Sequence, residues 1–147
     1  MLPWHGNCYQ AAREKGGTRL ASEFFTDIAS TVLSKSLDAQ AARQKTIANN
    51  IANVETPGYK RRYISFEEEL RMVLDRKNGR DVREGLRSLA PDLRTDSISP
   101  VGPDGNNVNI DAEISNLAKA SLSYKAAATL LEDKIEMLRS AIMEGKK

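Results

Sequence analysis

The sequence has very few of the residues that build catalytic, metal or disulfide sites. Its 147 residues include one cysteine, Cys8, and one histidine, His5, so no internal disulfide can form. His5 lies close to the start of the sequence, so a serine or cysteine nucleophile further along the chain has no histidine in its part of the sequence to act as a base. Neither a phosphate-binding glycine loop nor the spacing of zinc ligands occurs. We therefore predict no enzyme activity, no catalytic residues, no metal and no cofactor.

Aromatic residues and long apolar runs are also scarce. Aromatics make up 5% of the chain, and no apolar run approaches the ~20 residues that span a bilayer. The start of the chain lacks the apolar stretch of ~7–15 residues found in cleaved secretory signals. Basic and acidic residues nearly balance, at 22 and 20. This composition favours long helices with narrow apolar stripes, and it predicts neither nucleic-acid binding nor membrane insertion.

Two segments carry a heptad pattern, in which apolar side chains recur alternately three and four positions apart. The first covers residues 22–56, where Pro57 is expected to end the helix. The second covers residues 108–147, with Asn109 or Asp111 as its N-cap. Because a lone helix buries little of such a stripe, we predict a mainly α fold in which both helices pack as an antiparallel coiled-coil hairpin. The predicted heptad seam consists of Leu33, Leu37, Ile47, Ile51, Val54, Ile114, Leu117, Tyr124, Leu131, Ile135, Leu138 and Ile142.

Further large apolar residues lie off this heptad seam. If the hairpin buries only the seam, these side chains stay exposed and indicate neighbours beyond the hairpin. A self-sufficient helical monomer is the alternative. The off-seam residues are Phe24, Phe25, Ile28, Val32, Leu122, Leu130 and Met137.

The middle of the chain, residues 57–107, is predicted to contain a turn, a short amphipathic helix and a flexible segment that is irregular or short β. Residues 56–59 place proline and glycine as a type II turn requires. Ser65 and Glu68 form a capping-box pattern at the start of the short helix. From residue 77 onward, prolines and glycines predict a loop with at most a short strand or hairpin.

Residues 1–21 show no sustained helical period. One interpretation is a disordered tail. The other is a wrongly assigned start codon, because Lys15 to Thr18 can be encoded by a purine-rich ribosome-binding stretch just before Leu20.

Asparagines gather where the first helix is expected to end. Asn49, Asn50 and Asn53 are poor helix formers, so propensity does not explain their position. We expect their side chains to bond backbone groups at the helix exit or on a neighbouring segment.

These asparagines belong to a stretch that resembles the N-terminal motif of the flagellar rod and hook family. Residues 104–111 are similar to that family's lead into its C-terminal helix, and residues 121–124 and 137–142 are most like its proximal rod subunits. The residues that match the family motif are Ala48, Asn49, Asn50, Ile51, Ala52, Asn53, Thr56, Pro57, Gly58 and Tyr59.

The resemblance implies a structural subunit of the proximal flagellar rod that polymerises through its terminal helices into the motor drive shaft. It implies a periplasmic place in the basal body and export through the flagellar type III apparatus without a cleaved signal. Expected partners are other copies of the chain, neighbouring rod proteins, the rod adaptor, the MS ring and the export apparatus. The alternatives are a second short proximal rod subunit of the family and a cytoplasmic coiled-coil adaptor.

Overall fold

The computed structural model describes residues 27–144 of the 147-residue chain. The tail predicted for residues 1–21, and the off-seam residues Phe24 and Phe25, lie outside the described residues, so their interpretation stays a prediction. The described elements are, in order, α2 (Ile28–Ala52), β1 (Arg62–Ser65), α3 (Glu67–Leu74), α4 (Gly79–Ser88), β2 (Asp92–Thr95) and α5 (Ile110–Glu144).

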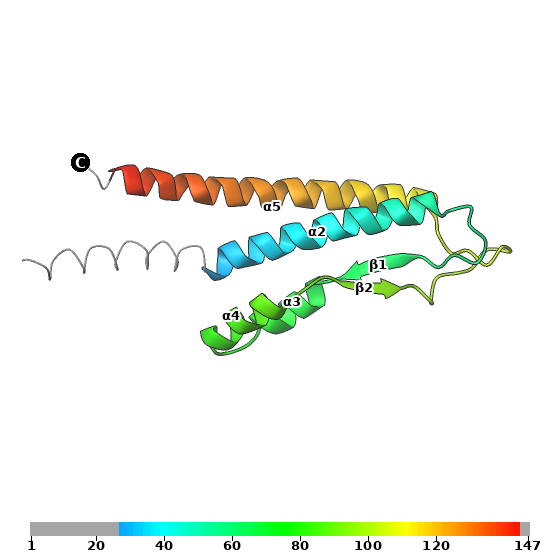
Figure 1. Cartoon of the computed structure of the whole chain (residues 1–147), viewed down its shortest axis with the longest axis horizontal. Helices are drawn as coiled ribbons and strands as arrows, with labels where there is room; N and C mark the ends of the chain where they lie inside the picture. The colour runs from blue at the N-terminus through cyan, green and yellow to red at the C-terminus, as the bar shows by residue number, and fades with distance from the viewer. Residues whose placement is uncertain (1–26, 145–147) are drawn as a thin grey trace, which may run out of the picture.

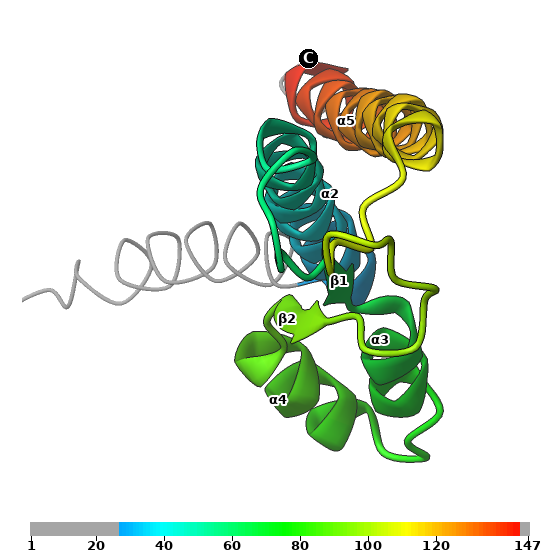
Figure 2. The ribbon, with the colours of Figure 1, turned by 90° about the vertical axis from the view of Figure 1, so that its right-hand side faces the viewer.

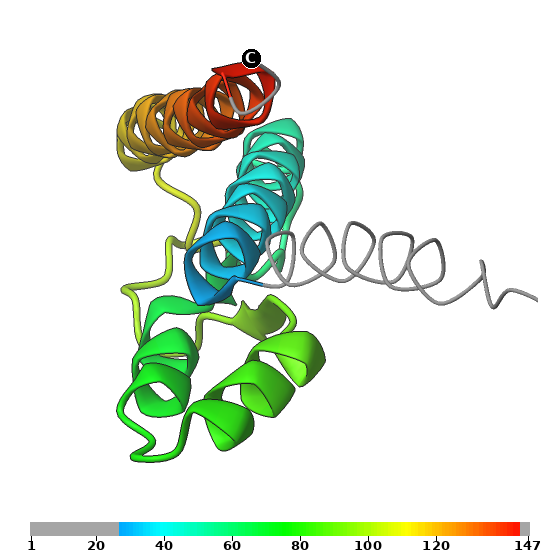
Figure 3. The same ribbon diagram turned by 90° about the vertical axis from the view of Figure 1, so that its left-hand side faces the viewer.

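Helix α2 lies between two layers. It runs antiparallel to α5 along the long axis of the molecule (Figure 1). The end-on views place β1, β2, α3 and α4 on the side of α2 opposite α5 (Figures 2 and 3). The strands pair antiparallel, with Arg62 opposite Thr95 and Ser65 opposite Asp92. The predicted mainly α fold, with two long helices packed together and a short β segment in the middle, is confirmed.

The boundaries of α2 lie inside the predicted range of 22–56. Asp27 precedes the first turn in an extended conformation, and its carboxylate forms an ion pair with Lys134 of α5. The helix ends at Ala52, before the residues that Pro57 constrains, because the Asn53 N–H turns to the carbonyl of Asn50 at 3.1 Å. Side-chain contacts described below hold this early exit in place.

The apolar core lies between α2 and the middle of the chain. Leu86 is completely buried and Phe66 is 2% exposed. Ile28 and Val32, the off-seam residues of α2 that the structure describes, pack against this core, so the middle segment covers them within the same chain. The core cluster comprises Ala39, Ile64, Phe66, Val73, Val82, Leu86 and Leu89.

The prediction of a loop from residue 77 onward is wrong where α4 forms. Asn78 caps this helix, because its side-chain oxygen accepts a hydrogen bond from the Arg80 N–H at 3.1 Å. Apolar residues at helical spacing then bury one face of α4 and its exit, and these residues are Val82, Leu86 and Leu89.

Gly85, one of the glycines that suggested a loop, permits close packing of α4 on α3. A Cβ atom at this position would lie 2.8 Å from Cγ1 of Val73 and 2.8 Å from a guanidinium nitrogen of Arg76. The glycine therefore reflects a close approach of two helices and not a break in the helix.

The capping box predicted for α3 is also wrong. Ser65 ends β1, and Phe66 takes the N-cap position without a side-chain cap. Burial of Phe66 in the core fixes where the helix starts, and the first acidic residue, Glu67, bonds Arg43 of α2 through both carboxylate oxygens at 2.7 and 2.8 Å.

Helix α5 begins as predicted, but its covered face differs from the heptad seam. Asn109 is its N-cap, since the side-chain oxygen accepts the Ala112 N–H at 3.0 Å. The covered face combines three of the seven seam residues of α5 with small and polar residues, so several seam isoleucines remain outside it. Its buried or half-buried members are Glu113, Asn116, Leu117, Ala120, Ser121, Ala127, Ala128, Leu131, Lys134 and Leu138.

We expect Leu86→Ala to lower the free energy of unfolding by ~2–5 kcal/mol, because it leaves a cavity in the core. Met72 of α3 is 60% exposed, so the matched change Met72→Ala should stay within ~0.5 kcal/mol of the parent. Urea unfolding followed by circular dichroism measures both. Equal effects would contradict the placement of the core.

Candidate assembly site

The chain leaves α2 through the predicted type II turn, which the structure confirms. Gly58 has a φ of +72°, as the third residue of such a turn requires. The Tyr59 N–H closes the turn on the carbonyl oxygen of Thr56 at 3.2 Å. The turn sends the chain back along α2 as β1.

Asn106 caps the exit of α2 from the other end of the chain. Its side-chain amide donates to the carbonyl oxygens of Asn53, Val54 and Thr56 at 3.0, 2.9 and 3.0 Å. The Asn53 and Thr56 carbonyls also accept the Thr56 and Tyr59 N–H groups in the turns, so the buried amide adds a second donor to these two and supplies one to the carbonyl of Val54. This contact explains why α2 ends at Ala52.

Backbone contacts join the same two segments. The Gly58 N–H donates to the carbonyl oxygen of Asp104 at 2.9 Å, and Lys60 Nζ donates to that of Gly105 at 2.8 Å. Gly105 has a φ of +82°, and a Cβ atom there would lie 3.3 Å from Cα of Gly58. Residues 48–60 and 104–111, which carry the family resemblance, therefore bind each other directly.

Asn50 is the central residue of the motif. It is completely buried, and its amide pairs with the backbone of Arg62 much as a strand would. Its Nδ2 donates to the Arg62 carbonyl at 2.7 Å, while its Oδ1 accepts the Arg62 N–H at 3.0 Å and the Tyr59 hydroxyl at 3.3 Å. The same Nδ2 also donates to Oε2 of Glu113 at 2.8 Å. One side chain thus joins α2, β1 and α5.

Glu113 of α5 is a completely buried carboxylate. Its Oε1 accepts a hydrogen bond from Nε of Arg61 at 2.8 Å, and its Oε2 accepts the bond from Asn50. A buried charge of this kind is tolerated only when it is paired and hydrogen-bonded. Its position fixes the first turn of α5 against the end of α2.

Asp96 and Asn107 complete this group of polar contacts. The Arg61 N–H donates to Oδ1 of Asn107 at 2.6 Å, and Nδ2 of Asn107 donates to the Asp96 carbonyl at 2.9 Å. The Asp96 carboxylate lies 3.4 Å from the guanidinium of Arg61. We call Asn50, Arg61, Asp96, Asn107 and Glu113 the polar junction.

The Asp96 carboxylate is held in its charged form. Hydrogen bonds from the Ser99 hydroxyl at 2.7 Å, then from the Ser99 and Ile98 N–H groups, lower its pKa from 3.8 to about 2, and the Arg61 charge adds to this effect. Asp96 therefore contributes a negative charge to the polar junction at neutral pH.

The remaining motif residues divide into two groups. Asn53 bonds the Asn49 carbonyl through Nδ2 at 2.7 Å and accepts the Thr56 hydroxyl at 3.3 Å, while Ile51 is half-buried. The exposed members are Ala48, Asn49, Ala52, Thr56, Pro57 and Gly58. The expectation that asparagines bond the helix exit and a neighbouring segment is confirmed for Asn50 and Asn53.

The structure separates the residues of the predicted heptad seam. Most are at least half-buried, namely Leu33, Leu37, Ile47, Ile51, Val54, Leu117, Leu131 and Leu138. Four on α5 are exposed, with Ile114, Tyr124, Ile135 and Ile142 at 54, 39, 49 and 64%. The off-seam residues Leu122, Leu130 and Met137 are exposed at 71, 57 and 67%. Helix α5 thus carries large apolar side chains, on more than one side of the helix, that residues 27–144 leave exposed.

Three residues of the polar junction escaped the sequence analysis: Arg61, Asp96 and Glu113. Arg61 looks like one member of a short basic run, Asp96 like a member of a mixed-charge stretch, and Glu113 like an ordinary acidic residue of a first helical turn. The signal that could have found Glu113 is its place on the covered side of α5, four residues before Leu117.

The arrangement holds segments together and has no catalytic geometry. Within residues 27–144, histidine, cysteine and carboxylate side chains form no cluster that could hold a metal ion. The helices in this part of the chain include none with an apolar stretch long enough to cross a bilayer.

A pair of long terminal helices, tied together at an asparagine-rich exit and apolar on its outer helix, is what the motif resemblance to flagellar axial proteins leads one to expect. The chain matches the family model described as flagella basal body rod protein over residues 32–60. It is 34% identical to the flagellar basal body rod protein FlgB of Yersinia enterocolitica over 124 residues, which cover 76% of this chain and 90% of that protein. The chain belongs to the flagellar basal body rod protein family.

Other FlgB proteins give the same result. Over 128 residues the chain is 30% identical to FlgB of Bacillus subtilis, covering 78% of this chain and 92% of that one. Over 126 residues it is 31% identical to FlgB of Escherichia coli, covering 76% of this chain and 90% of that protein. The chain is therefore a structural protein of the flagellar basal body, not an enzyme, and it associates with other components of the rod.

We expect Asn50→Ala to lower the free energy of unfolding by ~2–5 kcal/mol, because it leaves Arg62 backbone groups and Glu113 with too few partners. Asn49→Ala is the matched control: the residue type, the change and the helix are the same, but Asn49 is exposed. Its effect should stay within ~0.5 kcal/mol. Chemical unfolding measures both, and similar losses would contradict the role of Asn50.

The polar junction should also show a specific acid dependence. The pKa of Asp96 lies below its ordinary value, so its contribution to stability is complete above pH ~4 and is lost as pH falls through about 2. Over this range we expect the wild type to lose up to ~2 kcal/mol more than Asp96→Asn. Unfolding free energies measured at several pH values check this, and parallel curves would contradict it.

Proposed function

We propose that this chain is a subunit of the proximal flagellar rod, polymerising through its terminal helices into the drive shaft of the motor. The exposed apolar face of α5 is the observation that carries the proposal. Ile114, Ile135 and Ile142 recur on the heptad positions of this helix and stay about half or more exposed.

The arrangement of the elements in layers explains why α5, and not α2, has apolar side chains available for contact with neighbouring subunits. The middle segment covers one side of α2 and α5 covers another (Figure 2), whereas Ile114, Ile135 and Ile142 of α5 stay exposed in the described part of the chain. Burying a large aliphatic side chain contributes ~1.5–3 kcal/mol relative to leaving it exposed. A row of such side chains along one helix therefore favours packing against neighbouring helices.

The partners we propose are other copies of the chain, the neighbouring rod proteins, the rod adaptor and the MS ring. The place is the periplasmic part of the basal body, reached through the flagellar type III export apparatus without a cleaved signal. Family membership supports these assignments. In this proposal the family-motif residues hold the exit of the hairpin in place. The buried part of the heptad seam packs the two helices together, and its exposed part on α5 forms the assembly face.

A clean deletion of the gene tests the function. If the chain is a rod subunit, the deletion strain should lack flagella, and the gene supplied in trans should restore them. The protein should also be found in isolated basal bodies. Normal flagellation of the deletion strain, or a protein confined to the cytoplasm, would reject the rod and favour a cytoplasmic adaptor.

Substitutions on α5 test the assembly face. Ile135→Asp should abolish rod assembly, because it places a charge where the proposal buries an aliphatic side chain, while export continues. Thr129→Asp is the control, since Thr129 is exposed on the same helix and lies outside the heptad seam. Flagellar counts and basal-body composition in complemented strains are the measurements. Wild-type flagellation with Ile135→Asp would count against this face.

A further inference from the structure

We propose that a groove between α2, β1 and α5 receives the acidic and apolar C-terminal part of α5 from a second copy of the chain. This inference rests on the proposed assembly function and names the surfaces of one contact within it. The proposal follows from the shape and charge of the groove, the chemistry of the later turns of α5, and the length of that helix.

The groove is an apolar hollow with a volume of about 320 Å³. Its floor contains Ile47, Ile64 and Ala120, which are 4, 8 and 2% exposed. The space is far larger than the ~30 Å³ that one water molecule occupies. An aliphatic side chain suits this floor better than solvent does.

Cations surround this floor. Arg43, Arg61, Arg62 and Lys119 line the groove, and no carboxylate lines it. Arg43 and Arg61 already pair, mainly with Glu67 and Glu113. Among the carboxylates of residues 27–144, none forms an ion pair with Arg62 or Lys119. The groove therefore presents free positive charge beside an apolar floor, which fits an aliphatic side chain flanked by carboxylates.

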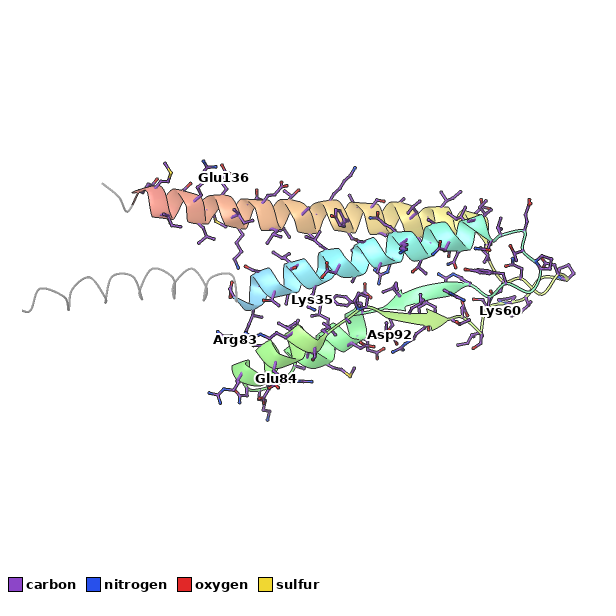
Figure 4. All side chains as sticks on the ribbon, in the orientation of Figure 1. Lys35, Lys60, Arg83, Glu84, Asp92 and Glu136 are labelled. Atoms are coloured by element: carbon purple, nitrogen blue, oxygen red, sulfur yellow. The ribbon has the colours of Figure 1, made fainter. Side chains whose placement is uncertain are left out.

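The later turns of α5 have this chemistry. Glu132, Ile135, Glu136, Met143 and Glu144 line one shallow face of the helix together with Ser140 and Arg139, so three carboxylates and one guanidinium give this face a net negative charge. Ile135 is 49% exposed and Met143 is 64% exposed. Glu136 points away from α2 and from the middle segment (Figure 4). We call Glu132, Ile135, Glu136, Met143 and Glu144 the acidic ridge.

The groove and the acidic ridge of one molecule cannot meet. Both include residues of the same continuous helix, and the 16 residues from Ala120 to Glu136 span ~24 Å at ~1.5 Å per residue. Since α5 runs without a break, it cannot fold back into its own groove (Figure 1). A second copy can supply the ridge, and each added copy then leaves one free groove and one free ridge. Such a contact between unlike surfaces forms a ring if the rotation between copies closes and an open assembly if it does not.

The test is a charge exchange in the full chain, measured by sedimentation velocity over a dilution series up to ~1 mM. Lys119→Glu and Glu136→Lys should each weaken self-association at least ~10-fold, because each places like charges across the contact. The double variant K119E/E136K should restore it. Lys125→Glu and Glu68→Lys make the same charge changes at exposed positions outside both surfaces, and they should leave association unchanged.

A wild type that stays monomeric throughout, or a double variant no better than the singles, would overturn the inference. So would control variants that weaken association as much as Lys119→Glu does. The proposed function is judged separately by the deletion strain. Loss of flagella in that strain, together with normal flagella in the Lys119→Glu strain, would reject the groove contact alone.

Discussion

The carboxylate of Glu113, completely buried at the start of α5, is the constraint on which the rest of the structure depends. A charge removed from water must be paired and hydrogen-bonded, so the chain has to bring Arg61 and Asn50 to it. Arg61 comes from the segment after the Pro57-Gly58 turn, and Asn50 comes from the last turn of α2. Meeting this requirement places α2, β1 and α5 relative to one another. It also gives a physical reason why the two segments of family resemblance occur together, since each supplies partners for the other.

The polar junction leaves the two long helices unequal. On α2 the heptad seam is largely covered, and the off-seam residues Ile28 and Val32 pack against the core of α3, α4 and β1. On α5 the face that packs against α2 is made partly of small and polar residues such as Ala120. Ile114, Ile135 and Ile142, which share one heptad position, stay exposed to solvent. A subunit that completed both helices internally would have little reason to assemble. Within residues 27–144, α5 is the one of the two long helices that leaves large apolar side chains exposed, and the hairpin holds them in a fixed arrangement.

Much of this fold follows from the sequence, in particular the helix pair, the turn at Gly58 and the cap at Asn109. These features depend on local rules of periodicity, backbone conformation and capping. The errors have a common cause. Gly85 breaks helices in general but here permits close packing of two helices, and Ser65 is a good cap but here belongs to a strand. The choice of α5 face, like the burial of Glu113, depends on contacts between residues more than 50 positions apart, which no local pattern records.

The central claim is that the polar junction fixes the hairpin so that the outer face of α5 packs against neighbouring subunits. Electron cryo-microscopy of isolated basal bodies, at a resolution that shows side chains, tests it most directly. The account predicts that Asn50, Arg61 and Glu113 keep their contacts in the rod and that Ile114, Ile135 and Ile142 lie buried against adjacent chains. A rod in which these isoleucines face solvent, or in which α5 has separated from α2 at the polar junction, would contradict it.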